Sequence, residues 1–70
     1  MHQQLEEVIK ERRNLLRLTQ EDLASMAGIA LRTLKAIELG KGNPSLRTLQ
    51  KLAEVLGMEV HLQVKKINNE

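Results

Sequence analysis

Basic side chains crowd the middle of this sequence, and they are the residues best suited to hold a charged partner. Residues 30–52 carry five basic residues against one acid, Glu38, so this segment has a charge of +4. The five are Arg32, Lys35, Lys41, Arg47 and Lys51. Grouped cations bind phosphates when a fold turns them toward one side. A solvated helical surface is the alternative explanation of the same charges.

Groups that could catalyse a reaction or hold a metal are missing from the sequence. It contains no cysteine, and its two histidines, His2 and His61, are not spaced with further ligands as a metal site requires. Neither histidine has the serine and carboxylate context of a nucleophilic triad. No aromatic residue is present to stack on the bases of single-stranded nucleic acid. We therefore expect a binding protein that is not an enzyme and uses no cofactor.

The length of 70 residues predicts one small domain with a thin margin of stability. Small domains often gain support from a disulfide, a metal or a partner. Without cysteines or a metal motif, a partner chain is the support that remains. No segment approaches the ~20 apolar residues of a membrane span, and the first ten residues lack the apolar core of a signal peptide. These features predict a cytoplasmic protein with no membrane partner.

Apolar residues recur at the 3.6-residue period of a helix through most of the chain, which predicts an all-α domain over residues 1–57. The first helix is expected at about residues 3–17. Thr19 can cap a second helix with Asp22 as its reciprocal partner. Gly28 suits the left-handed end of that helix.

The third helix follows about two residues later at "LRTLKAIE", and the fourth covers "LRTLQKLAEVL" after a cap at Ser45. Two short helices joined by a tight glycine turn within a four-helix domain form a helix-turn-helix. On the third helix, Leu34 and Ile37 must face the core. At about 100° per residue, four other side chains of this helix then point outward. They are Arg32, Lys35, Ala36 and Leu39.

Residues 58–66, "MEVHLQVKK", follow the helices with a different pattern. Apolar and polar residues alternate there, as is typical of a half-buried strand. The apolar set is Met58, Val60, Leu62 and Val64. Because a single strand is not stable alone, we expect it to pair antiparallel with the same strand of a second copy, centred on Leu62, and to form a homodimer. Residues 67–70 are expected to form a flexible tail.

The segment "TQEDLASMAGIALRTLKAIELGKGNPSLRTLQKLAEVLGM" resembles the Cro/C1-type (Xre) helix-turn-helix family of phage repressors and bacterial regulators. The matching features are Thr19-Gln20, Leu23-Ala24, Ala27-Gly28-Ile29, Leu34, Ile37-Glu38, Gly40-Lys41, Asn43-Pro44-Ser45, Leu49 and Ala53. The resemblance implies a lambda-repressor-like fold of four helices. It also implies a dimeric transcriptional repressor that binds a palindromic operator in double-stranded DNA, on the bacterial nucleoid.

The resemblance assigns the reading of bases to the third helix. Leu31, Arg32 and Ala36 match base-reading positions, and Lys35 matches a flanking one. Thr33 matches a position that commonly touches the DNA backbone. An arginine can bind guanine O6 and N7 together, whereas leucine and alanine can touch only the methyl group of thymine.

Other matching positions imply contacts to phosphate. Gln20 matches a glutamine that contacts phosphate or the edge of the half-site. We expect the turn after the third helix to lie over a phosphate and to fix the register without reading sequence. The residues of this turn are Lys41, Gly42 and Asn43.

Two further positions are expected to be structural, and two depart from the family pattern. Arg13 and Glu38 match a pair that joins the first and third helices, and a carboxylate facing DNA would repel it. Ala30 stands where relatives place a serine or threonine cap, at a cost of about 1 kcal/mol. Leu39 stands at a position that is often polar, and with apolar residues at 31, 36 and 39 we expect direct readout of bases to be sparse.

A short Xre-type domain that ends in a dimer-forming strand is similar to the HipB-like antitoxins. Those proteins repress their own operon and bind a HipA-like kinase toxin, so the resemblance implies the same two partners here. Two alternatives stay open. One is a stand-alone Xre-type repressor, and the other is a protein-binding module whose strand joins the sheet edge of another protein by β-augmentation.

Overall fold

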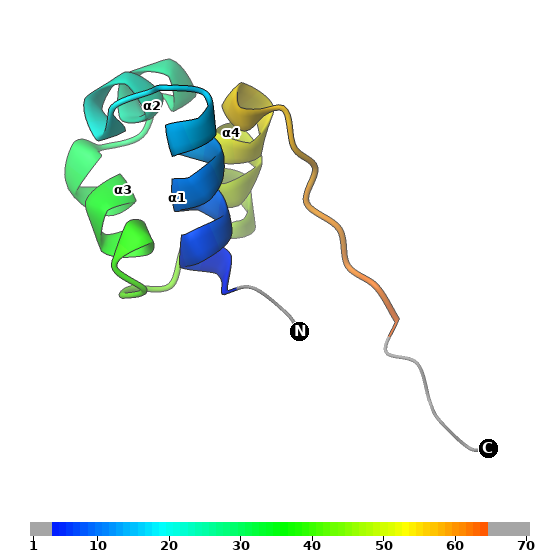
Figure 1. Cartoon of the computed structure of the whole chain (residues 1–70). Helices are drawn as coiled ribbons and strands as arrows, with labels where there is room; N and C mark the ends of the chain where they lie inside the picture. Colours follow the sequence, from blue (N-terminus) through cyan, green and yellow to red (C-terminus); the bar gives the residue numbers. More distant parts are fainter. Residues whose placement is uncertain (1–3, 65–70) are drawn as a thin grey trace.

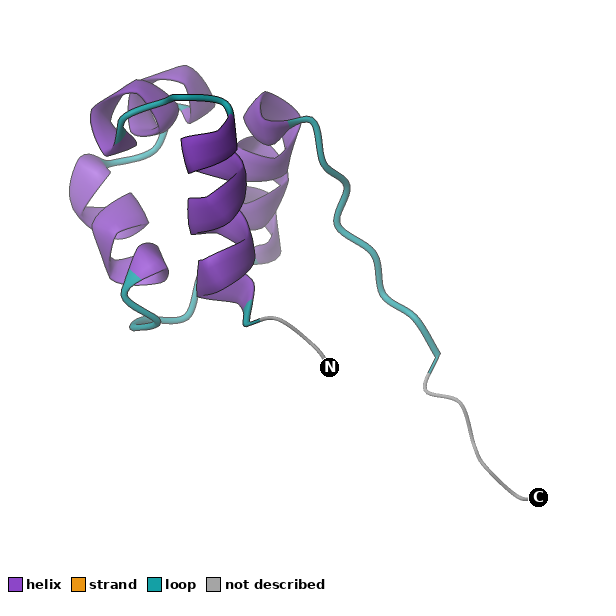
Figure 2. Ribbon diagram, viewed as in Figure 1, coloured by secondary structure: helices purple, strands orange, loops and turns teal. Residues whose placement is uncertain are grey.

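The computed structural model describes residues 4–64, which fold into four helices around one core (Figure 1). The helices are α1 (Leu5–Leu15), α2 (Gln20–Ala27), α3 (Leu31–Glu38) and α4 (Leu46–Leu56). All regular structure within residues 4–64 is helical (Figure 2). The predicted all-α class and the order of four helices are confirmed. None of the helices described is both long enough and apolar enough to span a membrane.

α1 is shorter than its predicted span of residues 3–17. It begins at Leu5, and residue 3 lies outside the described part of the chain. It ends at Leu15, and Arg17 has a positive φ of 60° that turns the backbone out of the helix. The apolar periodicity continues past this point in the sequence, so it could not locate the end of the helix.

Polar caps and one glycine set the ends of the next elements. The N–H of Asp22 donates to Thr19 Oγ1 over 2.9 Å, and the N–H of Thr19 donates to Asp22 Oδ2 over 3.0 Å. This is the predicted capping box of α2. Gly28 ends α2 with a left-handed φ of 72°, and α3 begins three residues later. Ser45 Oγ accepts from the N–H of Thr48 over 3.1 Å and caps α4 as predicted.

Aliphatic side chains from all four helices fill the core. Its largest fully buried side chains are Leu23, Leu34, Leu52 and Leu56. Ile9 of α1 and Ile37 of α3 join them at 5% exposure each. Burying one such side chain contributes roughly 1.5–3 kcal/mol. The two core residues of α3 therefore fix which side of that helix faces outward.

The predicted C-terminal strand does not form within the single chain, since residues 58–64 contain no strand. The N–H of Met58 still donates to the carbonyl of Ala53 over 2.9 Å, at the end of α4. The chain then runs away from the four helices (Figure 1). A strand exists only with a hydrogen-bonded neighbour, and no segment within residues 4–64 lies beside it as one. The remaining residues of the predicted strand, 65 and 66, and the tail 67–70 lie outside the described residues.

Candidate nucleic-acid interface

α3 presents one buried side and one free side. Leu34 is fully buried and Ile37 is 5% exposed, so both point into the core. Arg32 and Lys35 are exposed, and Leu39, just after the helix, is 70% exposed. The outward direction predicted from helical angles is confirmed for these three side chains. Two cations and one exposed leucine therefore lie on the side of α3 that a partner could contact.

Most of the predicted DNA contacts line one shallow hollow between α3 and the turn that follows it. We call this hollow the α3 surface, and its residues are Arg32, Thr33, Ala36, Ile37, Lys41, Gly42, Asn43 and Pro44. Gly40 and Gly42 have φ angles of 75° and 83°, which glycine adopts without the strain of a side chain. The N–H of Lys41 donates to the carbonyl of Ala36 over 2.9 Å. The turn thus folds back on the last turn of α3 and brings the backbone of Lys41 beside it.

Three predicted DNA contacts lie outside this hollow. Lys35 is exposed, but it does not line the hollow. Leu31 is half-buried and packs against the core, so part of its apolar surface is already covered. Gln20 begins α2, and its side chain is held by α3 instead of projecting freely.

A buried ion pair joins α1 to α3, as the sequence predicted. Arg13 Nε donates to Glu38 Oε2 over 2.7 Å, and Arg13 Nη2 donates to Oε1 over 3.0 Å. Arg13 Nη1 also donates to the carbonyl of Leu18 over 2.7 Å. Within residues 4–64 no buried side-chain nitrogen or oxygen lacks a partner. Each nitrogen of the Arg13 guanidinium and each carboxylate oxygen of Glu38 therefore has a hydrogen-bond partner, as buried charges require.

Gln20 is the third member of this cluster, and no sequence pattern indicated its contact with Glu38. Its Nε2 donates to Glu38 Oε1 over 3.0 Å. The two residues are 18 positions apart, so no periodic pattern links them. A primary amide has two N–H donors and one oxygen. One N–H and the oxygen of Gln20 therefore remain for another partner while Glu38 fixes the orientation of the amide.

Acidic side chains surround the start of α2. The backbone N–H of Thr19 donates to Asp22 and, together with the Thr19 hydroxyl, lowers the pKa of that carboxyl below its usual value of 3.8. Glu21 is a second exposed acid in the same turn. Two acids near Gln20 would repel phosphate, so a phosphate contact there needs cations nearby. No three acids or histidines within residues 4–64 come together to hold a metal ion.

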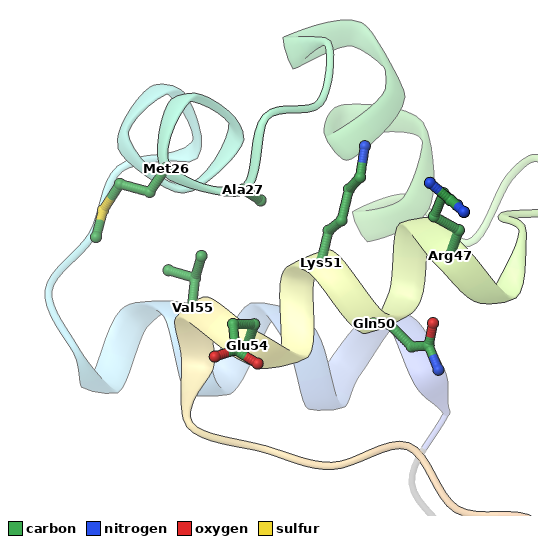
Figure 3. Close-up of a pocket in the computed structure, with 7 residues that line it drawn as sticks. All are labelled: Met26, Ala27, Arg47, Gln50, Lys51, Glu54 and Val55. Carbon is green, nitrogen blue, oxygen red and sulfur yellow. The ribbon is translucent and has the colours of Figure 1, made fainter.

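The cations of the basic middle do not all line the same hollow. Arg47 and Lys51 project from α4 beside a second hollow, between α2 and α4 (Figure 3). Met26 and Ala27 of α2 and Val55 of α4 supply its apolar lining (Figure 3). The other three cations of the group lie on α3 or in the turn after it. Those three belong to α3 or to the turn that folds back on it.

Comparisons with known proteins agree with this geometry. A helix-turn-helix family model matches residues 9–62. An uncharacterized HTH-type transcriptional regulator of Methanocaldococcus jannaschii is 44% identical over 52 residues, which cover 74% of this chain and 79% of that protein. The match begins in α1 and runs past α4, so it includes every element that positions the α3 surface.

Two solved structures share the fold. SinR of Bacillus subtilis, the master regulator for biofilm formation, in complex with DNA, has a TM-score of 0.75 at 32% identity, over 80% of this chain and 90% of that one. The restriction-modification controller protein C.AhdI of Aeromonas hydrophila has a TM-score of 0.76 at 33% identity, over 79% and 83%. With the family match over most of its length and these relatives, this chain belongs to the Cro/C1-type (Xre) helix-turn-helix family of DNA-binding transcriptional regulators.

Proposed function

We propose that this chain represses transcription as a homodimer bound to a palindromic operator in double-stranded DNA. The observation that carries this proposal is the α3 surface, where two cations and small side chains gather beside an exposed helix. Similarity to SinR, whose structure was solved with DNA, supports the same use of this surface. In this arrangement α3 enters the major groove with its N-terminal residues nearest the base edges.

Base reading would fall chiefly to Arg32. Its guanidinium is exposed and can bind guanine O6 and N7 together, which is worth roughly 1–3 kcal/mol of discrimination. Ala36 offers no hydrogen bond and would touch a thymine methyl group. Leu31 would do the same only with the part of its side chain that the core leaves free. Lys35 would flank these contacts.

Phosphate contacts would fix the position of α3 in the groove. The turn after α3 would provide them through the side chain of Lys41 and the backbone around Gly42 and Asn43. From α3, Thr33 would contact the DNA backbone. Gln20 would donate to a phosphate through the N–H that Glu38 leaves free. These contacts set affinity and register without reading sequence.

Dimerisation would use the C-terminal segment. Val60, Leu62 and Val64 are exposed there, at 39%, 98% and 91%. We propose that the alternating segment becomes a strand only when a second copy supplies its neighbour, with Met58 at the base of the pair. Two-fold symmetry would then set the two α3 helices on half-sites about one helical turn, ~34 Å, apart.

The finer role of a HipB-like antitoxin stays a prediction from the resemblance. It implies a HipA-like kinase toxin as a second partner, and its premise was a strand that residues 58–64 do not form by themselves. Binding to another protein by β-augmentation had the same premise, and so does the homodimer. We propose the dimeric repressor because the family match supports DNA binding, whereas the kinase toxin rests on the resemblance alone. Mass spectrometry of what copurifies with the tagged chain at its native level would reveal a stoichiometric kinase if one exists.

Selection of bound duplexes from a randomised pool tests the proposal. The expected result is enrichment of a palindrome with two half-sites about one helical turn apart, and repression of a reporter promoter that carries it. Enrichment of a single half-site would reject the dimer. Recovery of no preferred sequence would reject the repressor.

A further inference from the structure

An apolar groove runs between α1 and α4, separate from the α3 surface. Its walls are Leu5, Val8 and Ile9 of α1 and Leu49, Leu52 and Leu56 of α4. Ala53 also lines it, and the C-terminal segment begins at its rim, where Met58, Glu59 and Val60 contribute to the lining. None of these residues lines the α3 surface. A partner held in this groove would therefore leave α3 free for DNA.

The groove is incompletely covered by its own chain. Leu5 is 45% exposed and Val60 39% exposed. An adjoining hollow shares Val8 and Met58 with the groove and extends past Glu11 and Arg12 to Leu15, which is 69% exposed. The apolar side chains of the groove itself are gathered instead of scattered singly, which favours a site of interaction.

The same chain carries apolar side chains that fit such a groove. In the C-terminal segment, Glu59 Oε1 lies 2.8 Å from His61 Nε2. Side chains two residues apart share a face of an extended backbone. Val60, Leu62 and Val64 alternate with these two residues, so they would share the opposite face once the segment is a strand. Leu62 and Val64 are almost wholly exposed. The chain thus presents both an apolar groove and an uncovered apolar face.

We propose that this groove receives Val64 from a second copy of the chain, which rests on the homodimer proposed above. In antiparallel pairing centred on Leu62, Val60 of one copy lies directly opposite Val64 of the other, on the same face, with Cβ atoms about 4.5–5.5 Å apart. Because Val60 lines the groove, the residue opposite it, Val64 of the second copy, would lie at the same groove. Two-fold symmetry fills both grooves in the same way.

The chain's own Val64 is badly placed for this role. It lies four residues beyond Val60, which is about 13 Å along an extended backbone. Its side chain is 91% exposed, so it does not pack into the groove of its own chain. Each groove is therefore completed only by the other copy.

Cysteine cross-linking tests the assignment directly, since the chain contains no cysteine of its own. One preparation carries Val64→Cys with an affinity tag, and an untagged one carries Leu5→Cys. The two are mixed, allowed to exchange and treated with a short bismaleimide. The control replaces the second preparation with Met26→Cys, because Met26 is 63% exposed and lines the hollow between α2 and α4.

The expected result is a tagged–untagged product with Leu5→Cys, formed at least about five times faster than with Met26→Cys. Equal rates for the two would overturn the inference. The inference would also be overturned if a double variant with Leu5→Cys and Val64→Cys formed the cross-link only between the two cysteines of one chain. If sedimentation shows dimers while the Leu5→Cys product is missing, the groove assignment fails and the dimeric repressor stands. Monomers on the operator would defeat both.

A charge substitution gives a second, independent test. Val64→Asp would carry a carboxylate into the apolar groove, so we expect the dimer dissociation constant to rise at least about tenfold. Gln63→Asp adds the same charge one residue away, on the opposite face of the strand. We expect it to change the dimer dissociation constant less than about threefold. Equal effects of the two substitutions would show that Val64 has no special environment.

Discussion

The amide of Gln20 at the start of α2 donates from Nε2 to Oε1 of Glu38 at the end of α3, over 3.0 Å. The same carboxylate is held by Arg13 of α1. One buried carboxylate therefore sets the spacing of three helices and the orientation of the glutamine amide. This relationship links the stability of the fold to the contact that Gln20 is proposed to make with phosphate.

Replacing Gln20 and Lys41 should affect DNA binding in different ways. Lys41→Ala removes a cation, so the slope of log K against log salt should become shallower by about 0.9. Gln20→Ala removes a neutral donor and should weaken binding without changing that slope. Fluorescence anisotropy on one duplex at several salt concentrations measures both effects. Equal slopes for wild type and Lys41→Ala would remove Lys41 from the proposed phosphate contacts.

Arg32→Ala should relax base preference at one position of each half-site. The loss of a bidentate contact to guanine is expected to reduce discrimination there by about 1–3 kcal/mol. Arg47→Ala is the matched control, because Arg47 is an exposed arginine beside the other hollow. Binding to a set of duplexes with single base changes gives the measurement. If Arg32→Ala weakens binding to every duplex equally, Arg32 contacts phosphate and not a base.

Breaking the buried ion pair should destabilise the fold strongly. Glu38→Ala leaves Arg13 buried without its partner, at an expected cost of about 3–5 kcal/mol. The double variant Arg13→Met with Glu38→Leu removes both charges and should recover much of this loss. Urea unfolding followed by circular dichroism measures both. If Glu38→Ala lowered the free energy of unfolding by less than about 1 kcal/mol, water would be taking the place of the carboxylate beside Arg13.

Several features were predictable because they depend on neighbours in sequence. The caps at Thr19 and Ser45, the left-handed end at Gly28 and the buried side of α3 follow from local hydrogen bonds and helical angles. The bond from Gln20 to Glu38 was not predictable, since only tertiary packing brings these residues together. The strand does not form in the single chain because alternation describes which face a side chain takes and does not supply a neighbouring strand.

Ala30→Ser should stabilise the domain, because α3 begins without a side-chain cap. A serine there can accept from the N–H groups of the first turn, for a gain of about 1 kcal/mol. Ser45→Ala, at the capped start of α4, should cost a similar amount. Thermal unfolding of the two variants provides the comparison. No gain from Ala30→Ser would show that the local backbone cannot place the hydroxyl.

The capping carboxylate of Asp22 predicts a pH-dependent contribution to stability. Its pKa is lowered in the folded state by the hydrogen bonds from Thr19, so the contribution is present above the unfolded pKa and is lost as pH falls through the folded value. Asp22→Asn should therefore be less stable than wild type at neutral pH, with the difference shrinking below about pH 4. Glu21→Gln, in the same turn without a capping bond to Thr19, is the control. A difference independent of pH would mean that the charge of Asp22 plays no part.

The central claim is that α3 presents its outward side chains to double-stranded DNA, and salt-dependent binding to a selected duplex tests it most directly. We predict that affinity falls steeply between 50 and 200 mM salt, and linearly on logarithmic axes, as expected for a protein that neutralises several phosphates. We also predict that Arg32→Ala and Lys41→Ala weaken binding while Arg47→Ala does so far less. Binding that is insensitive to salt, or equally insensitive to all three substitutions, would contradict the placement of α3 as the recognition helix.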